Sequence, residues 1–145
     1  MQIKNFTAAK ALIHWDGKIL LLRESSQYHD GAQTGKYDVP GGRLNPGEDL
    51  LEGLKREVLE ESGLDLLSAE HFFVDDVVVE KPDEIWHISR NYFSCAAVSG
   101  EVILSKDHDV FLWIDAKKYR EVPIIENLAQ VFEAYLKKFN PPGED

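Results

Sequence analysis

Three glutamates close together on one predicted helix are the residues of this chain best suited to chemistry. Glu57, Glu60 and Glu61 are spaced i, i+3 and i+4, so in a helix they share one face. Like charges this close repel one another, and a helix gains no stability from stacking them. A cation should therefore lie among them, and a hard divalent metal ion that prefers oxygen ligands is the simplest candidate.

Glu61 is the most informative of the three because of the side of the helix on which it lies. At about 100° per residue, one arc of the helix carries apolar side chains that must face the core. These are Leu50, Leu51, Leu54 and Val58. Glu61 projects from the same arc, where a carboxylate is costly unless it is paired or binds metal. Glu57 flanks it, and Glu60 lies further round, beside Arg56.

The helix that carries these residues has recognisable ends. Asp49 is a favourable N-cap, and Gly63 is the usual residue for a left-handed C-cap. Glu52 and Arg56 can pair at i, i+4 on the outer face. The segment before the helix, residues 37–40, is extended because its proline disfavours helical angles in the residue before it. Two glycines, residues 41 and 42, then allow backbone angles that other residues avoid.

Strands and two further helices are expected around this central helix. Apolar or alternating segments occupy residues 6–15, 18–23, 72–79, 85–98 and 110–114. Asp115 can cap a short helix at residues 116–119, and Pro123 can open a last helix with apolar residues at helical spacing. Residues 25–36 are polar and form a loop that could contact a ligand. This order predicts a mixed sheet covered by helices, an α/β fold in the broad sense.

The composition of the 145 residues bounds the class of protein. An apolar fraction of 43% suits one ordinary globular domain spanning residues 1–145. The net charge of −10 argues against a nucleic-acid polymer as partner, but a small phosphorylated substrate remains compatible because bound Mg²⁺ inverts the local field. No apolar run approaches about 18 residues, and no signal peptide is evident, so we expect no membrane association. The single cysteine, Cys95, permits no intramolecular disulfide and suits a reducing, cytoplasmic setting.

The glycine pair and the helix together resemble a known motif. Gly42, five residues, Glu48, seven residues and then Arg56-Glu-Val-Leu-Glu-Glu-Ser-Gly-Leu64 fill every fixed position of the Nudix box. The flanking order, with Tyr-Asp-Val-Pro-Gly-Gly before the box and a Trp-bearing strand near the end, is also similar to the Nudix hydrolase family. The resemblance implies a Nudix-type α/β/α sandwich with a mixed β-sheet. The implied reaction is hydrolysis of a phosphoanhydride bond in a small nucleoside diphosphate-linked substrate.

The resemblance also implies roles for individual residues. The metal ligands would be Glu57, Glu60, Glu61 and the carbonyl of Gly41, binding Mg²⁺ with Mn²⁺ as a substitute. Glu57 would also activate water, and Arg56 would orient the glutamates. Support of the box geometry would come from Gly42, Glu48 and Gly63. A further acid before the Trp-bearing strand would be Asp107, with Glu101 as a competitor. The number of metal ions stays open.

Substrate recognition is the weakest part of what the sequence implies. Candidate contacts are Arg23 at the end of a predicted strand, Tyr37 before the glycine pair, and Trp86, which follows a turn and could stack on a base. A nucleoside triphosphate, a nucleotide sugar and ADP-ribose are all compatible substrates. Which phosphorus is attacked stays open, as does the oligomeric state, with a homodimer as one arrangement found among relatives.

Two other functions fit the same fold. One is a non-catalytic nucleotide-binding sensor, against which the intact glutamates weigh. The other is an enzyme similar to isopentenyl diphosphate isomerase. The chain is short for that class, and its single cysteine, Cys95, lies deep in a predicted strand.

Overall fold

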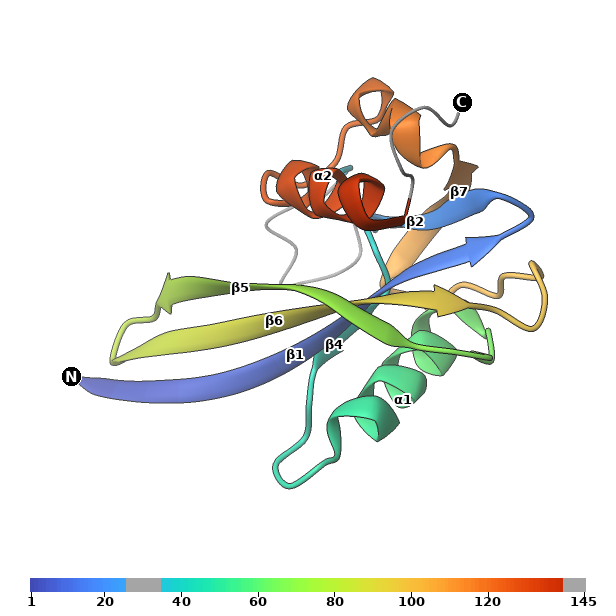
Figure 1. Ribbon diagram of the computed structural model, residues 1–145. Coiled ribbons are helices and arrows are strands. Elements are labelled where there is room, and N and C mark those ends of the chain that lie inside the picture. The colour runs from blue at the N-terminus through green and yellow to red at the C-terminus, as the bar shows by residue number, and fades with distance from the viewer. Residues whose placement is uncertain (26–34, 140–145) are drawn as a thin grey trace.

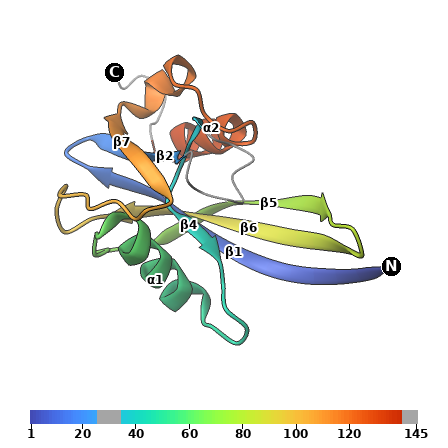
Figure 2. The same cartoon turned by 180° about the vertical axis from the view of Figure 1, so that it is seen from behind.

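The computed structural model describes residues 1–25 and 35–139 and contains one mixed sheet between two helices (Figure 1). Helix α1 (Leu50–Ser62) covers one face of the sheet, and helix α2 (Leu128–Phe139) covers the other, as Figure 2 shows from behind. The predicted α/β fold with a mixed sheet between helices is therefore confirmed. Most of the predicted loop 25–36 lies outside the described residues.

Across the described residues the sheet has seven strands, and β1 (Gln2–Trp15) lies at its centre. The strands run in the order β3-β2-β1-β6-β5, while β4 pairs with β1 and β7 pairs with β2. The remaining strands are β2 (Lys18–Glu24), β3 (Tyr37–Asp38), β4 (Gly41–Arg43), β5 (Glu70–Glu80), β6 (Glu84–Ala96) and β7 (His108–Ile114). Strands β1 and β6 are parallel, and the other pairs are antiparallel.

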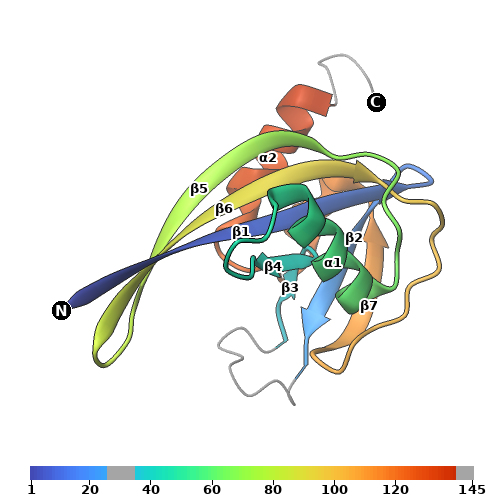
Figure 3. The same cartoon turned by 90° about the horizontal axis from the view of Figure 1, so that it is seen from below.

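Strand β1 changes partner along one of its edges, and this change positions the glycine pair. Its middle residues, Ala8 to Lys10, pair with β4, whereas His14 and Trp15 pair with β2. Its opposite edge pairs with β6 along almost its whole length. The first half of β1 therefore extends with β5 and β6 away from the body of the molecule (Figure 3). The short strand β4 lies at the root of this extension, directly before the loop that leads to α1.

Successive side chains of β1 and β2 point to opposite faces of the sheet, so the core is divided into two clusters, one under each helix. The α1 side buries Ala9, Ala11, Ile13, Leu20, Leu54, Val58, Phe93 and Cys95. The α2 side buries Leu12, Ile19, Leu21, Tyr92, Leu128, Val131 and Phe132. Both helices are thus held by apolar packing against the sheet, which fixes α1 and its glutamates relative to β4.

The predicted ends of α1 are confirmed. The Asp49 side chain accepts a hydrogen bond from the Glu52 amide at 3.2 Å, and Gly63 adopts a left-handed φ of 72°. Two details of the helix were wrong. Leu51 is 43% exposed, because the buried arc is narrower than predicted and centres on Leu54. The predicted pair between Glu52 and Arg56 does not form, because the Arg56 side chain turns toward other carboxylates.

One further predicted boundary, the start of the last helix, was wrong. Asp115 caps the short 3-10 helix η1 (Ala116–Glu121) as predicted, but α2 begins at Leu128 and not at Pro123. The residues between them are tied to β3. The Tyr37 amide donates to the Pro123 carbonyl at 2.9 Å, and the Ile125 amide donates to the Tyr37 carbonyl at 3.0 Å. This extended pairing is incompatible with helix over the same residues.

The predicted strands 72–79 and 85–98 occupy Glu70–Glu80 and Glu84–Ala96 in the structure. Within the described residues, no helix combines the length and the apolar character that crossing a bilayer requires.

Candidate active site

A cleft of about 820 Å³ opens where β4 and the following loop meet the side of α1 that carries the three glutamates. Its walls bring together residues that are far apart in sequence, from the first half of β1 to the loop before β7. All three glutamates of the predicted cluster line it, together with the Gly41 backbone and Asp107. The structure therefore gathers the predicted metal ligands and the predicted further acid at one place.

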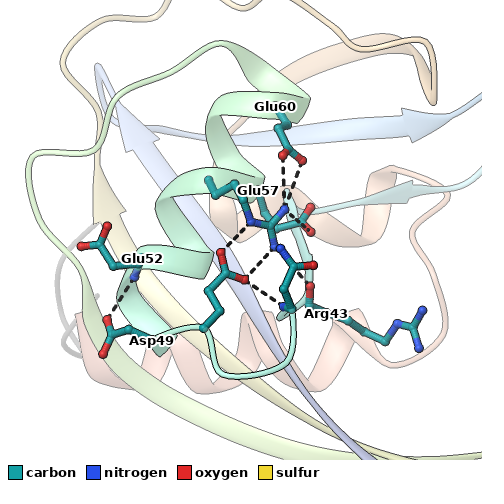
Figure 4. Close-up of polar contacts among 8 residues, drawn as sticks. Arg43, Asp49, Glu52, Glu57 and Glu60 are labelled. Atoms are coloured by element: carbon teal, nitrogen blue, oxygen red, sulfur yellow. Dashed lines mark hydrogen bonds and ion pairs between the residues drawn. The ribbon is translucent and has the colours of Figure 1, made fainter.

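The Arg56 guanidinium is the centre of a network that orders the acidic side chains (Figure 4). It donates twice to Glu48, from Nε at 2.7 Å and from Nη2 at 2.9 Å. Its Nη1 donates to Glu57 and to Glu60, both at 3.2 Å. Nη2 also reaches the Arg43 carbonyl at 3.4 Å, which ties the helix to the end of β4.

Glu48 anchors this network from the loop before the helix. Its carboxylate accepts two hydrogen bonds from Arg56 and one from the Asn45 amide at 2.9 Å. Together these hydrogen bonds lower the pKa of Glu48 to about 2, and those from Arg56 contribute most. A carboxylate that stays ionised and bidentate to arginine fixes both the loop and the guanidinium. This geometry gives Glu48 and Arg56 the positioning contacts that the motif implied.

Glu61 occupies the place that the helical arc indicated. Its Oε1 accepts a hydrogen bond from the Gly41 amide at 3.0 Å, so the carboxylate faces the sheet and not the solvent. Burial raises the pKa of Glu61, while the charge of Lys10 and the Gly41 amide oppose this rise. The costly carboxylate on the core side of α1 therefore accepts a hydrogen bond from a backbone amide and lies in the field of the buried Lys10 cation.

Gly42 lies directly against the carboxylate of Glu57. A Cβ added to Gly42 would lie 3.0 to 3.1 Å from the three carboxyl atoms of Glu57. Any side chain here would press on that carboxylate, and the absence of one makes room for it. Gly41 has a different constraint, since its φ of 133° is strained for other residues and its missing Cβ faces the Ala9 carbonyl.

The donor set in the cleft fits a hard divalent cation. Three carboxylates from one helix and a carbonyl from the facing strand are the oxygen ligands that such ions prefer. In residues 1–25 and 35–139, no three acidic, histidine or cysteine side chains already converge on one metal position. Glu57 and Glu60 instead contact Arg56, and Glu61 contacts Gly41. To bind an ion together, these carboxylates would have to turn from their present partners toward it.

Comparisons with known proteins agree with this geometry. Residues 5–135 match the family model described as NUDIX domain. The nucleoside triphosphatase NudI of Escherichia coli K12 is 31% identical over 111 residues, which cover 71% of this chain and 77% of NudI. The chain belongs to the Nudix hydrolase family.

Solved Nudix structures show the same fold. A MutT protein from Methanosarcina mazei Go1 superposes with a TM-score of 0.74 at 28% identity, covering 97% of this chain and 99% of its own. A MutT Nudix hydrolase from Burkholderia pseudomallei gives a TM-score of 0.74 at 24% identity, covering 90% and 98%. The chain is therefore a Nudix pyrophosphohydrolase, from a family that generally depends on a divalent metal and acts on small nucleotides.

Of the remaining predicted site residues of this Nudix domain, some line the cleft and others do not. Asp107 lines the main cleft, whereas Glu101 is exposed and lines neither this cleft nor the smaller one beside it. Arg23 forms a two-pronged ion pair with Asp109, with distances of 2.8 and 3.0 Å, so its donors are already engaged. Tyr37 is only 7% exposed and packs in the core under α2, so its ring offers no open face for a base.

Trp86 lies beside the cleft but is in contact with other side chains. Its Nε1 donates to Glu84 at 2.6 Å, and its ring packs edge-to-face on Phe6 with centroids 4.9 Å apart. Arg43 and Lys81 each place a cation 4.5 Å from the ring centroid. Stacking of Trp86 on a base stays a prediction, and the contacts favour a role in holding cations.

Sequence reasoning missed Lys10, which belongs to the site. Its Nζ lies 2.9 Å from Asp38, and its side chain is 12% exposed. Burial alone would lower the pKa of Lys10, but the nearby charges of Asp38 and Glu61 outweigh it and the pKa is raised. Lys10 lines a second cavity of about 160 Å³ that shares Gly41, Glu61 and Asp107 with the main cleft. The available signal was a lysine in the otherwise apolar residues 8–13.

Proposed function

We propose that this Nudix enzyme hydrolyses a phosphoanhydride bond of a nucleoside triphosphate with Mg²⁺ as its metal. The observation that carries the proposal is the set of Glu57, Glu60, Glu61 and Gly41 in one cleft, ordered by Arg56. The triphosphate is preferred to a nucleotide sugar or ADP-ribose because the relative NudI is a nucleoside triphosphatase. Mn²⁺ would serve as a substitute, since it accepts the same oxygen ligands.

The metal would be held by Glu57, Glu60, Glu61 and the Gly41 carbonyl. When bound, such an ion offsets phosphate charge, acidifies bound water and orients the reacting groups. The chain's own residues would transfer the protons of the reaction. The Glu57 carboxylate accepts the proton of the attacking water, because it is ordered by Arg56 and abuts the open position of Gly42. Asp107 would act as a further acid or base, and its position in the lining of the same cleft supports this role.

The two alternative functions are disfavoured by specific features. A sensor would not need the ordered glutamates, which are all present in one cleft. An isomerase that uses a cysteine needs a reactive thiol, but Cys95 is fully buried and burial raises the pKa of its thiol to about 12. We further infer one domain over residues 1–145 that works on free nucleotides in the cytoplasm, as a monomer or a homodimer.

Incubation with a panel of nucleoside triphosphates, nucleotide sugars and ADP-ribose, each with Mg²⁺, tests the proposal. We expect triphosphates to be cleaved and Glu57→Gln to lower kcat by about 10² to 10⁴-fold, the usual contribution of a general base. Glu61→Gln should also lose activity. Glu52→Gln is the matched control, because Glu52 lies exposed on the same helix outside the cleft.

Two outcomes would contradict the assignment. Wild-type turnover in Glu57→Gln or Glu61→Gln would refute the mechanism, and binding without turnover across the panel would favour the sensor.

Hydrolysis in water labelled with ¹⁸O shows which phosphorus is attacked, because the label appears in only one product. Gel filtration coupled to light scattering decides between monomer and homodimer.

A further inference from the structure

Arg43 carries a guanidinium that the catalytic network does not use. The residue is exposed and lies at the end of β4, next to the glycine pair. Its backbone carbonyl accepts a hydrogen bond from Arg56, but its side chain forms no ion pair or hydrogen bond within residues 1–25 and 35–139. The donors of this guanidinium are thus open to a ligand, whereas those of Arg23, Arg56 and Arg90 are engaged by carboxylates.

Two aromatic side chains hold the guanidinium of Arg43 in place. Its Cζ atom lies 4.5 Å from the ring centroid of Phe6 and 4.5 Å from that of Trp86. The two rings contact each other at 4.9 Å with an interplanar angle of 63°. A guanidinium that packs against aromatic rings keeps its edge available for hydrogen bonds, because the contact uses its flat face.

The register of the sheet explains why these three residues meet. Arg43 pairs with Ala8 on β1, and Phe6 is two residues before Ala8 on the same face. Trp86 on β6 pairs with Lys4, one step further along that face. The three residues come from three strands of the extended part of the sheet, and no short sequence motif joins them.

The charge of the cleft makes the position of Arg43 distinctive. The other charged residues that line this cleft, in the part of the chain that the structure describes, are all acidic. They are Glu48, Glu57, Glu60, Glu61 and Asp107. Figure 4 shows the Arg43 side chain leading away from Glu57 and Glu60. A polyanionic substrate would therefore meet, in one cleft, both the acidic groups and an open cation that points away from Glu57 and Glu60.

We propose that Arg43, positioned by Phe6 and Trp86, binds the phosphate of a nucleoside triphosphate that lies furthest from the glutamates. The proposal rests on the proposed function, since it concerns the same cleft, and it assigns a residue that selects the substrate. Guanidinium binds phosphate oxygens in pairs and with favourable geometry. A nucleotide sugar carries a neutral group where a triphosphate carries another phosphate. Arg43 therefore favours triphosphates, and Phe6 and Trp86 act through it as positioning residues.

Steady-state kinetics of Arg43→Gln test this selection. We expect KM for a triphosphate to rise about tenfold or more, in line with the loss of a charged hydrogen bond, while kcat changes by less than about threefold. KM for any nucleotide sugar that is cleaved should stay unchanged. Arg43→Lys should recover only part of the effect, since an ammonium lacks the planar pair of donors.

Arg120→Gln is the matched control. Arg120 is also an exposed arginine over an aromatic ring, 4.8 Å from the centroid of Tyr119, and its loss changes the net charge equally. It lies on η1, outside the cleft. Because both variants remove one positive charge, an effect shared by both would be a general field effect and would contradict the proposal.

Binding of inorganic tripolyphosphate without metal gives a second readout that needs no turnover. Calorimetry should show binding to the wild type that is at least about tenfold weaker in Arg43→Gln and intermediate in Trp86→Phe, which retains an aromatic ring. Absence of binding to the wild type, or equal binding by Arg43→Gln and Arg120→Gln, would overturn the subsite.

The two proposals fail in different ways. If no phosphoanhydride is cleaved but Arg43 still governs tripolyphosphate binding, the proposed function fails and the subsite is supported. If triphosphates are cleaved with the same KM by Arg43→Gln and the wild type, the function stands and the subsite is wrong. Turnover of nucleotide sugars alone would also contradict the selection by Arg43.

Discussion

Replacement of Lys10 by methionine should destabilise the protein far more than loss of an ordinary surface lysine. Lys10 Nζ lies 2.9 Å from Asp38, and the two side chains are 12% and 28% exposed. Methionine fills a similar volume but removes the charge. Asp38 and Glu61 would then lose the cation that offsets them in a partly enclosed cavity. Removal of one partner of a buried pair leaves an uncompensated charge.

The expected loss in the free energy of unfolding follows from this burial. Breaking a fully buried ion pair costs about 3 to 5 kcal/mol. Because Asp38 keeps more than a quarter of its side chain exposed, we expect the lower part of that range, about 3 kcal/mol. Lys4→Met is the matched control. Lys4 lies on the same strand and pairs with Glu84 at 3.0 Å, but it is 45% exposed, so its loss should cost at most about 1 kcal/mol.

Urea unfolding followed by tryptophan fluorescence measures these differences. A cycle of Lys10→Met, Asp38→Asn and the double variant isolates the pair, and we expect a coupling of about 1.5 kcal/mol or more. Asparagine retains the side-chain oxygen that accepts the Val39 amide at 2.7 Å, so the cycle tests charge and not the local turn. A Lys10→Met loss equal to that of Lys4→Met, or a coupling below about 0.5 kcal/mol, would refute the reasoning.

Two further predictions concern the glycine pair and the network anchor. Gly42→Ala should lower kcat by about 10 to 100-fold with little change in melting temperature, because its Cβ displaces the Glu57 carboxylate and not the fold. Gly41→Ala should instead lower the melting temperature, since alanine is strained at a φ of 133° and meets backbone atoms. Glu48 has a folded-state pKa lowered to about 2 from 4.5, so its stabilisation is complete above pH 4.5 and is lost as the pH falls toward 2. The difference in urea midpoint between wild type and Glu48→Gln should therefore shrink between pH 5 and pH 2, and a constant difference would contradict this.

The parts of the fold that local sequence determines could be predicted. The N-cap Asp49, the C-cap Gly63 and the cap Asp115 act over a few residues, and each was found where expected. The start of α2 could not be predicted in the same way. Helical periodicity from Ile125 onward is real, but the backbone there is tied to Tyr37, about 90 residues earlier in the chain. Such long-range pairing overrides local propensity and leaves no trace in a short window.

The same distinction between local and long-range determinants applies to the candidate site. Its three glutamates and Arg56 lie within one helix, so their spacing was enough to place them on a common face. Lys10 and Arg43 enter through the register of β1 with β4, which no local pattern specifies. Even within a helix, spacing alone did not predict which carboxylate pairs with Arg56. Spacing permitted Glu52, but the loop brings Glu48 into two-pronged contact, which is stronger than a single surface pair.

The charges of the site bear on how a substrate can enter it. Two cations, Arg56 and Lys10, contact or face acidic side chains in the cleft and in the smaller cavity beside it. Those acids are Glu48, Glu57, Glu60, Glu61 and Asp38. With all five ionised, the two cations leave three negative charges uncompensated, and two remain if Glu61, whose pKa is raised by burial, is protonated. Arg43 can offset one phosphate at the far side, but it lies away from this group. A triphosphate brings further negative charge to the same place, so its phosphates can approach the glutamates only together with a divalent cation. The crowded carboxylates thus make metal a condition for placing the reacting phosphates against the glutamates, whereas the far phosphate can bind at Arg43 without it.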